Sequence, residues 1–128
     1  RYRDGRWLAS RLRPCNDAAP QPPIREDGTY LITGGSGALG RRFARKLLDA
    51  GAGRVVLVSR TAKPAFDDPR LQVEAADIAD RAALDALLTR LNESGPPLRG
   101  IVHAAGVLED AMLLNATPEQ FARVLRPK

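Results

Sequence analysis

The sequence predicts an α/β fold built on a parallel sheet of about four strands, and three observations lead to this prediction. Short apolar runs alternate with longer amphipathic segments. The run at residues 54–58 is apolar on both faces, which is typical of an interior parallel strand. A glycine-rich turn joins the first strand to the first helix, as in open sheets that bind ligands at the carboxyl ends of their strands. We therefore expect a Rossmann-like, doubly wound sheet, of which the chain holds the first half.

Length and composition restrict the classes of protein to consider. The 128 residues suffice for one modest domain, 44% of them are hydrophobic, and the net charge is +5. The basic residues do not alternate with aromatic ones, so we expect no nucleic-acid partner, and an anionic cofactor explains part of the charge. Cys15 is the only cysteine, so it forms no internal disulfide, and no spacing suggests a metal site. With no apolar run of membrane-spanning length and no signal peptide, we expect no membrane partner and a cytoplasmic location.

The first 27 residues divide into two predicted segments. Residues 1–13 resemble the end of a preceding β-subdomain, because Asp4-Gly5 is a hairpin-turn dipeptide with extended residues on both sides. Residues 14–27 carry four prolines and no periodicity, which predicts a stiff, extended linker. The nucleotide-binding domain is then predicted over residues 28–128, and the chain is expected to be cut before that domain is complete.

A strand over residues 29–33 leads into the glycine-rich turn. Gly35, Gly37 and Gly40 occupy the three glycine positions of a G-x-G-x-x-G spacing between a strand and a helix. Glycine allows the backbone to turn tightly and to approach a phosphate, and the helix start offers N–H groups to a pyrophosphate. A plain glycine turn is the alternative, which the flanking strand and helix disfavour.

The helix after this turn is predicted to end at Gly51 and Gly53. Its apolar stripe, expected to face the sheet, is Leu39, Phe43 and Leu47, with Ala44 and Leu48 beside them. Its basic residues, expected to face water, are Arg41, Arg42, Arg45 and Lys46.

Ser59 and Arg60 follow the second strand, where an NAD-specific site would carry an acidic residue for the ribose 2′-hydroxyl. An arginine at this place suits the 2′-phosphate of NADPH, because its planar guanidinium pairs with phosphate oxygens. We therefore expect NADPH as the cofactor; a solvated loop arginine is the alternative.

The third strand, over residues 71–76, alternates apolar and polar residues as an edge strand does. It ends at Asp77-Ile78, where an adenine ring would lie, although a plain turn aspartate fits the spacing nearly as well. Asp80 is expected to cap the next helix, which residues 92–97 end. The apolar stripe of that helix is Leu84, Leu87, Leu88 and Leu91.

Residues 101–106 read as a short strand that ends in the small residues Ala104, Ala105 and Gly106. Small side chains at a strand end let a flat ligand lie against the backbone. His103 is expected to be a packed strand-end residue rather than a base, because no nucleophile pairs with it.

The last predicted helix opens with Thr117 as its cap, Pro118 at its first position and Gln120 completing a capping box. Its apolar stripe places Lys128 on the side that faces the sheet, with snorkelling past the core as the alternative. Pro127 is expected to kink or end the helix.

Taken together, these motifs resemble short-chain dehydrogenase/reductases, and in particular the ketoreductase domains of modular type I polyketide synthases. The motifs appear in the family's order: residues 33–40, 58–60, 76–78, 103–107 and 126–128. The resemblance implies an enzyme that uses NADPH to reduce a β-ketoacyl group, carried on an acyl carrier protein within a multidomain synthase, to the β-hydroxyacyl product.

The resemblance also assigns site residues. Ser59 and Arg60 would hold the 2′-phosphate, Asp77 and Ile78 would border the adenine, and residues 104–106 would face the nicotinamide-side ribose. Lys128 matches the catalytic lysine, which binds ribose and favours the ionised form of the proton-donating tyrosine. The pyrophosphate cradle would consist of Thr33, Gly34, Gly35, Ser36, Gly37, Ala38, Leu39 and Gly40.

Two features depart from the family pattern. Leu108-Glu109-Asp110 resembles the Leu-Asp-Asp signature of the subtype that gives a D-configured (B-type) hydroxyl, but its middle residue differs. The family's serine and tyrosine come after the lysine and are not in this sequence, and Tyr2 and Tyr30 are placed where neither reaches a substrate. These residues alone are therefore predicted not to reduce a ketone.

Two other functions remain open. A sugar-nucleotide epimerase or dehydratase of the same superfamily usually has an acidic residue after the second strand, and Ser59-Arg60 argues against it. A non-reducing structural module within an assembly line is the second; the intact glycines and Lys128 argue against it.

Overall fold

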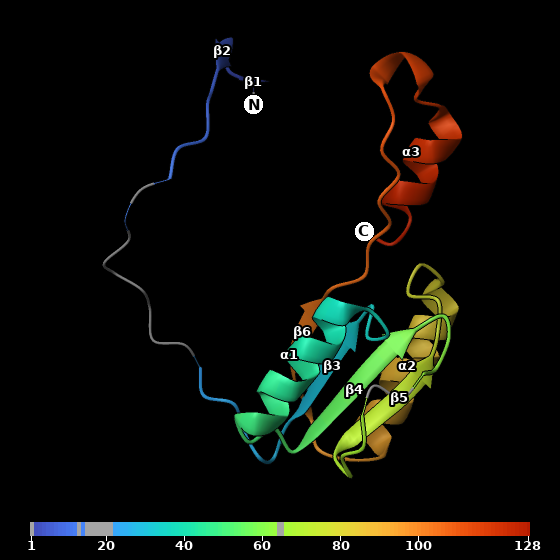
Figure 1. Cartoon of the computed structure of the whole chain (residues 1–128). Helices are drawn as coiled ribbons and strands as arrows, with labels where there is room; N and C mark the ends of the chain where they lie inside the picture. Colours follow the sequence, from blue (N-terminus) through green and yellow to red (C-terminus); the bar gives the residue numbers. More distant parts are fainter. Residues whose placement is uncertain (1, 13, 15–21, 64–65) are drawn as a thin grey trace.

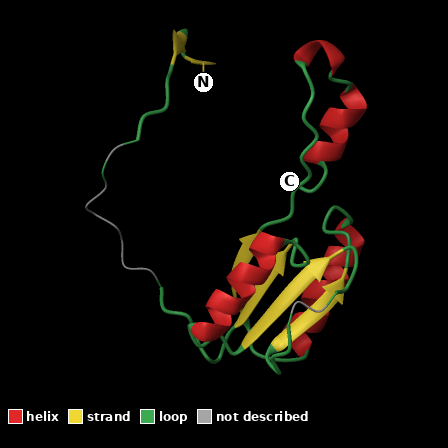
Figure 2. Ribbon diagram, in the orientation of Figure 1, coloured by secondary structure: helices red, strands yellow, loops and turns green. Residues whose placement is uncertain are grey.

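The computed structural model describes residues 2–12, 14, 22–63 and 66–128. Cys15, with the expectation that it forms no disulfide, and the middle of the predicted linker lie outside the described residues. Figures 1 and 2 show an α/β body with a separate hairpin at the N-terminal end and a helix, α3, beyond the carboxyl ends of the strands.

The body is a four-stranded sheet in which every pair of neighbouring strands is parallel. Its strands are β3 (Thr29–Thr33), β4 (Arg54–Ser59), β5 (Leu71–Ala75) and β6 (Leu98–His103), in the order β5-β4-β3-β6. The parallel pairing and this order confirm the predicted Rossmann-like α/β class. The apolar strands β3 and β4 lie in the interior, and β5 lies at an edge, as its alternating pattern predicts.

The sheet is covered on both faces. Helix α1 (Ala38–Asp49) packs Ala44 and Leu48 against one face, and helix α2 (Arg81–Glu93) packs Leu87 and Leu91 against the other. Neighbouring strand residues point to opposite faces, so Ile32 joins the first core and Leu31 the second. The Asp80 carboxylate accepts hydrogen bonds from the backbone of Ala82 and Ala83 at 2.9 and 3.2 Å, which confirms the predicted cap of α2.

The buried face of α1 agrees with the predicted one only in part, at Ala44, Leu47 and Leu48. Leu39 and Phe43 are 60% and 38% exposed, and the buried residues are Gly40, Ala44 and Leu48. A Cβ at Gly40 would lie 2.7 Å from the carbonyl oxygen of Gly34, so the helix begins too close to the turn for a side chain there. The approach of backbone to backbone, which favours small residues, therefore decides which face α1 buries.

The strand and helix after α2 also differ from the prediction. Strand β6 begins at Leu98, paired with Thr29, and ends at His103, so Ala104, Ala105 and Gly106 follow the strand rather than end it. A short 3-10 helix, η1 (Leu113–Asn115), precedes α3 (Pro118–Leu125).

Helix α3 has the predicted start but not the predicted packing. The Thr117 hydroxyl accepts from the Gln120 N–H at 3.3 Å, and the Gln120 side chain accepts from the Thr117 N–H at 2.8 Å, which confirms the capping box. The helix buries none of its residues, and Phe121 and Leu125 are 56% and 61% exposed. The helix ends before Pro127, as predicted, so Lys128 lies past its end, and the expectation that Lys128 faces the sheet is wrong.

The N-terminal hairpin joins β1 (Tyr2–Arg3) to β2 (Arg6–Trp7). Asp4 and Gly5 have φ values of 49° and 75°, the positive angles that a tight hairpin turn requires. The predicted hairpin is thus present, with its second strand limited to two residues.

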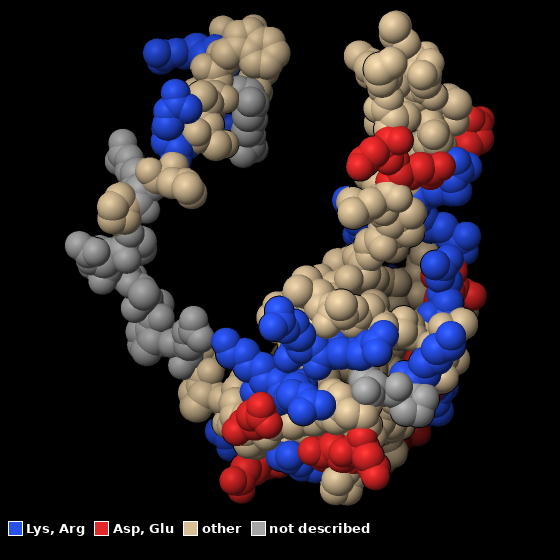
Figure 3. All heavy atoms as spheres, viewed as in Figure 1, with Lys and Arg blue, Asp and Glu red and all other residues tan. Residues whose placement is uncertain are grey.

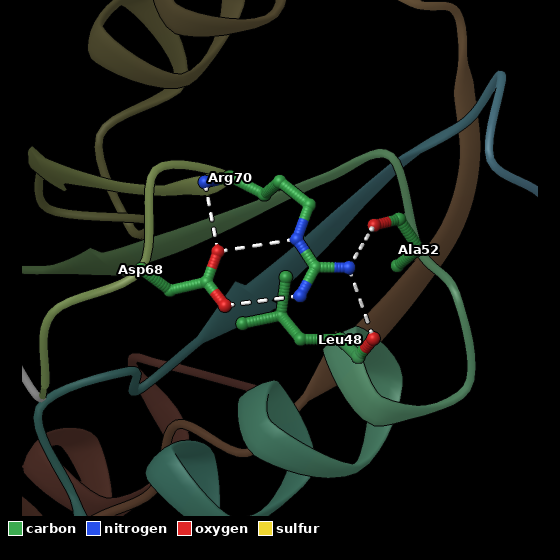
Figure 4. A network of polar contacts seen from close by, with 4 residues as sticks. All are labelled: Leu48, Ala52, Asp68 and Arg70. Carbon is green, nitrogen blue, oxygen red and sulfur yellow. Dashed lines mark hydrogen bonds and ion pairs between the residues drawn. The ribbon is translucent and has the colours of Figure 1, made fainter.

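Arg70 ties the loop before β5 to the end of α1 (Figure 4). Its guanidinium donates to both carboxylate oxygens of Asp68 at 3.1 and 3.0 Å, and to the carbonyl oxygens of Leu48 and Ala52 at 3.1 and 3.4 Å. These carbonyls lie at and just past the last turn of α1, where backbone oxygens lack partners within the helix. The arginine holds the pKa of Asp68 below its ordinary value, chiefly through the side-chain hydrogen bond.

A second arginine fastens α2 to the sheet. Arg54, at the start of β4, donates to the Thr29 hydroxyl at 2.9 Å, to the Leu91 carbonyl at 2.7 Å and to the Ser94 hydroxyl at 3.3 Å.

Among the described residues there is no helix long and apolar enough to cross a membrane, and no cluster of three or more residues suited to hold a metal ion.

Candidate functional site

A cleft of about 620 Å³ lies at the carboxyl ends of the strands. Its walls come from the glycine turn after β3, the ends of β4 and β5, the loop after β6 and the end of α3. The lining residues are Gly34, Ser36, Gly37, Val58, Ser59, Arg60, Thr61, Ala76, Asp77, Ile78, Ala79, Ala104, Ala105, Gly106, Val107, Arg123, Arg126 and Pro127. The carboxyl edge of an open parallel sheet is where such folds bind ligands.

The glycine turn forms the floor of the cleft because backbone touches backbone there. Gly34 has a φ of +68°, and a Cβ on it would lie 2.7 Å from the backbone of Ala104 and Ala105. A Cβ on Gly35 would lie 2.5 Å from the Cβ of Leu57 in β4. The turn therefore fills the space between β4 and the loop after β6, and no other residue type fits these positions without displacement.

Hydrogen bonds fix the shape of this turn. The Gly35 N–H donates to the Val58 carbonyl at 3.1 Å, and the Gly37 N–H donates to the Gly34 carbonyl at 3.0 Å. The Arg41 guanidinium donates twice to the Ser36 carbonyl, at 3.1 and 2.8 Å. Helix α1, described in full, has neither a side-chain cap nor an acidic residue in its first turn. The positive end of its dipole is thus open to an anion.

Ser59 and Arg60 form the next part of the wall. The Ser59 hydroxyl donates to the Thr61 carbonyl at 2.6 Å, which folds the loop after β4 back on itself. The Arg60 side chain is exposed beside the cleft and makes no ion pair with a described residue. Its guanidinium is therefore available to an anionic ligand.

Asp77 is held on both sides of its carboxylate. One oxygen accepts from the Ala79 N–H at 3.0 Å, and the other accepts from the Arg126 guanidinium at 2.9 Å. Ile78 packs against the core beneath α2. The part of the cleft wall that follows β5 therefore combines the polar Asp77 with the apolar Ile78.

Thr33 links the ends of two strands. Its hydroxyl lies 2.8 Å from the Nδ1 atom of His103 and 3.4 Å from the Ala105 N–H, and its carbonyl accepts from the Ala104 N–H at 3.1 Å. His103 is exposed, so the expectation of a packed histidine is not met. These bonds place the small residues after β6 against the glycine turn.

The cleft brings together most of the residues that the sequence singles out. Ten of them line it, from all four predicted segments: Gly34, Ser36, Gly37, Ser59, Arg60, Asp77, Ile78, Ala104, Ala105 and Gly106. Five do not line it and form or adjoin its floor: Thr33, Gly35, Ala38, Leu39 and Gly40. Lys128 is not among the lining residues either, although its neighbour Pro127 is.

Sequence reasoning assigned no role to Arg123 of α3 or to Arg126, which follows that helix. Arg123 and Arg126 both line the cleft, and Arg123 also pairs with Glu109 at 2.6 Å. The side-chain hydrogen bond from Arg123 is the main reason that the pKa of Glu109 lies below its ordinary value. No spacing rule marks these two residues, because their position depends on how the chain after β6 returns to the end of β5.

Comparisons with known proteins agree with this geometry. A family model described as "KR domain" matches residues 28–128. A phenolphthiocerol synthesis type I polyketide synthase of Mycobacterium marinum is 46% identical over 114 residues, which cover 80% of this chain and 5% of that protein.

Solved structures show the same similarity. An A-type ketoreductase from a modular polyketide synthase superposes with a TM-score of 0.73 at 36% identity, covering 89% of this chain and 26% of that one. An N-terminal ketoreductase from the macrolactin assembly line has a TM-score of 0.74 at 28% identity, covering 86% and 25%. The chain therefore spans a twentieth of the first of these relatives and about a quarter of each of the two solved chains.

Proposed function

The chain belongs to the KR domain family, that of the ketoreductases, and on this basis we propose that it is the nucleotide-binding part of an NADPH-dependent reductase in polyketide biosynthesis. The proposed substrate is a β-ketoacyl thioester on an acyl carrier protein, and the product is the β-hydroxyacyl thioester. The other domains of a synthase and the carrier protein are the proposed partners. The cytoplasmic location stays a prediction.

One observation carries the proposal. Four sequence segments that are separated by 16 to 25 residues meet in one cleft at the carboxyl edge of the sheet, and each supplies the type of residue that a dinucleotide needs. They are the glycine turn, the arginine after β4, the aspartate–isoleucine pair after β5 and the small residues after β6. A structural module without a ligand would not require these four features at the same edge.

The residues fit a phosphate-bearing nicotinamide nucleotide. The backbone contacts of Gly34 and Gly35 leave no side chain between the turn and a ligand, and the uncapped start of α1 presents N–H groups there. Arg60 has no carboxylate partner among the described residues, and no acidic side chain stands at its place to favour a ribose 2′-hydroxyl. We assign the pyrophosphate to the turn and the 2′-phosphate to Arg60 and Ser59.

The remaining roles follow from position. When bound, NADPH would supply the hydride for reduction of the ketone. Asp77 and Ile78 would border the adenine, the isoleucine offering an apolar surface, and residues 104–106 would face the nicotinamide-side ribose. Lys128 would bind ribose and, as a cation, favour the ionised form of the tyrosine that donates the proton in this family.

The proposed stereochemistry is the D-configured hydroxyl. It rests on the similarity of Leu108-Glu109-Asp110 to the Leu-Asp-Asp signature, with glutamate in place of the middle aspartate. In the structure this carboxylate is paired with Arg123, and the pairing holds the pKa of Glu109 below its ordinary value.

A binding titration tests the proposal. The 128-residue chain is titrated with NADPH and with NADH, and the dissociation constants are compared for the parent chain, Arg60→Ala and the control Lys63→Ala, which changes a cation of the same loop that does not line the cleft. We expect the parent chain and Lys63→Ala to bind NADPH more tightly than NADH. Arg60→Ala should lose this preference, with a change of about tenfold or more in the ratio of the two dissociation constants. Equal affinity for the two nucleotides, or binding of neither, would overturn the proposal.

A further inference from the structure

Helix α1 carries four basic side chains on its solvent side, and none of them is among the residues that line the cleft. Arg41, Arg42, Arg45 and Lys46, together with Asp49 and Phe66, line a shallow hollow of about 570 Å³, which we call the α1 basic face. In Figure 3 the basic side chains gather in the middle of the visible surface, with acidic side chains below them. Four of the basic residues that the sequence spreads over the whole chain thus lie together on this one helix face.

The charges of the α1 basic face are not neutralised within the described part of the chain. Six arginines outside α1 pair with carboxylates of described residues, but none of these ion pairs involves a residue of α1. Arg41 is bonded to the Ser36 carbonyl and Arg45 lies 4.6 Å from the centre of the Phe66 ring, neither of which removes charge. With Asp49 as the only carboxylate, four cations leave a net charge of three.

This arrangement is unfavourable for the helix itself. Arg41 and Arg45 are four residues apart, as are Arg42 and Lys46, so two pairs of like charges face each other on neighbouring turns. Such a pair costs a helix roughly 0.2–0.5 kcal/mol, whereas Lys46, in the last turn, interacts favourably with the helix dipole. The like-charge pairs thus do not stabilise the fold, and a partner that neutralises them would relieve their repulsion.

We propose that the α1 basic face docks the acidic surface of a protein partner. Phe43, which is 38% exposed on the same helix, offers an apolar contact of the kind that protein interfaces combine with charge. The cations extend over about one and a half helical turns, or roughly 7.5 Å, which suits a few carboxylates of a folded partner.

A nucleic acid fits the same surface less well. Single strands bind along extended basic grooves and stack bases on exposed aromatic rings. Here the Phe66 ring is partly buried against the core and faced by Arg45, and the acidic side chains below the basic area in Figure 3 would repel a continuing phosphate backbone. The observations thus favour a compact acidic protein surface.

Two substitutions separate this surface from the cleft. Arg42 and Lys46 line only the α1 basic face, and their side chains make no hydrogen bond or ion pair with any described residue. Arg42→Gln/Lys46→Gln therefore changes charge while keeping residues that favour helix. The control is Arg81→Gln/Arg90→Gln on α2, which removes the same formal charge from the opposite face of the sheet, where the two arginines pair with Asp85 and Glu74.

The experiment measures fluorescence anisotropy with two labelled probes, a helical peptide of glutamates and leucines and a DNA oligonucleotide of equal charge. We expect the parent chain to bind the peptide more tightly than the oligonucleotide. The α1 double variant should lose about tenfold in peptide affinity, and the α2 variant should change little. Circular dichroism verifies that both double variants are folded. If the α1 double variant does not fold, the single variant Arg42→Gln repeats the test, with an intermediate loss of peptide affinity as the expected result.

Equal losses in the two double variants would show that overall charge alone attracts the peptide, and the proposal would fail. Tighter binding of the oligonucleotide would make the partner class wrong. The test does not depend on nucleotide binding, so either proposal can fail without the other.

Discussion

The Thr33 hydroxyl lies 2.8 Å from the Nδ1 atom of His103, where β3 and β6 end side by side. The same hydroxyl oxygen is 3.4 Å from the Ala105 N–H, which donates to it. Its own proton can then be donated to Nδ1, and this hydroxyl thus connects β3, β6 and the loop after β6. Thr33 is 6% exposed, so water does not replace a missing bond easily.

We therefore expect Thr33→Val, which keeps the shape of the side chain, to loosen residues 104–106. The loss of a buried hydrogen-bonding group costs about 1–3 kcal/mol. Amide hydrogen exchange should become faster at Ala105, and the affinity for NADPH should fall. Thr33→Ser keeps the hydroxyl and is expected to restore both quantities; a serine variant as impaired as the valine variant would contradict this explanation.

Gly35→Ala tests the packing of the glycine turn. The added Cβ would lie 2.5 Å from the Cβ and 2.9 Å from the Cα of Leu57, in the middle of β4, so the turn must shift. Overpacking of this kind typically costs about 1–3 kcal/mol. The free energy of unfolding in urea should fall by that amount. The control is Gly106→Ala, where a Cβ meets nothing within 4 Å and stability should remain close to that of the parent chain.

Arg54→Lys is predicted to weaken the attachment of α2. A lysine ammonium cannot reach Thr29, Leu91 and Ser94 with the geometry of the guanidinium fork. Hydrogen bonds to charged groups contribute about 1.5–3 kcal/mol, so unfolding should become easier by an amount in this range. Arg99→Lys, at an exposed position in β6, serves as the control and is expected to change little. Similar losses in the two variants would disprove the role of Arg54.

The pair of Asp68 and Arg70 makes stability depend on pH. Because the pKa of Asp68 is below its ordinary value of 3.8 in the folded chain, the pair stabilises the fold above that value. This contribution is lost as the pH falls through the lowered pKa. The melting temperature of Asp68→Asn should therefore lie below that of the parent chain at neutral pH, and the two should converge in acid. A difference of constant size at every pH would count against this role.

The sequence predicts the elements well where local chemistry determines them. The Asp4-Gly5 turn, the Asp80 cap, the Thr117–Gln120 capping box and the parallel α/β class were all predicted, because each depends on a few adjacent residues or on strand periodicity. Ten of the predicted site residues line the cleft, because the carboxyl ends of parallel strands necessarily meet at one edge.

The failures have a different origin. Hydrophobicity favoured a stripe on α1 of which Ala44 and Leu48 are buried and Leu39 and Phe43 are exposed. At its start the helix buries Gly40 instead, because the backbone of the glycine turn leaves no room for a side chain there. The packing of α3, the place of Lys128 and the approach of Arg126 to Asp77 depend on the path of the chain between residues 104 and 117. That path contains no periodic signal.

The strand order also implies an order of assembly. Strand β3 pairs with β4, which starts 25 residues later in the chain, and with β6, which starts about 70 residues later. Because the entropy of loop closure grows with the length of the loop, the β3–α1–β4 unit is the less costly one to form first. The nucleotide cleft needs the loop after β6 and would be completed only when that distant pairing is made. In a chain that is still being synthesised, the glycine turn would therefore form before the loop after β6 reaches it and completes the cleft.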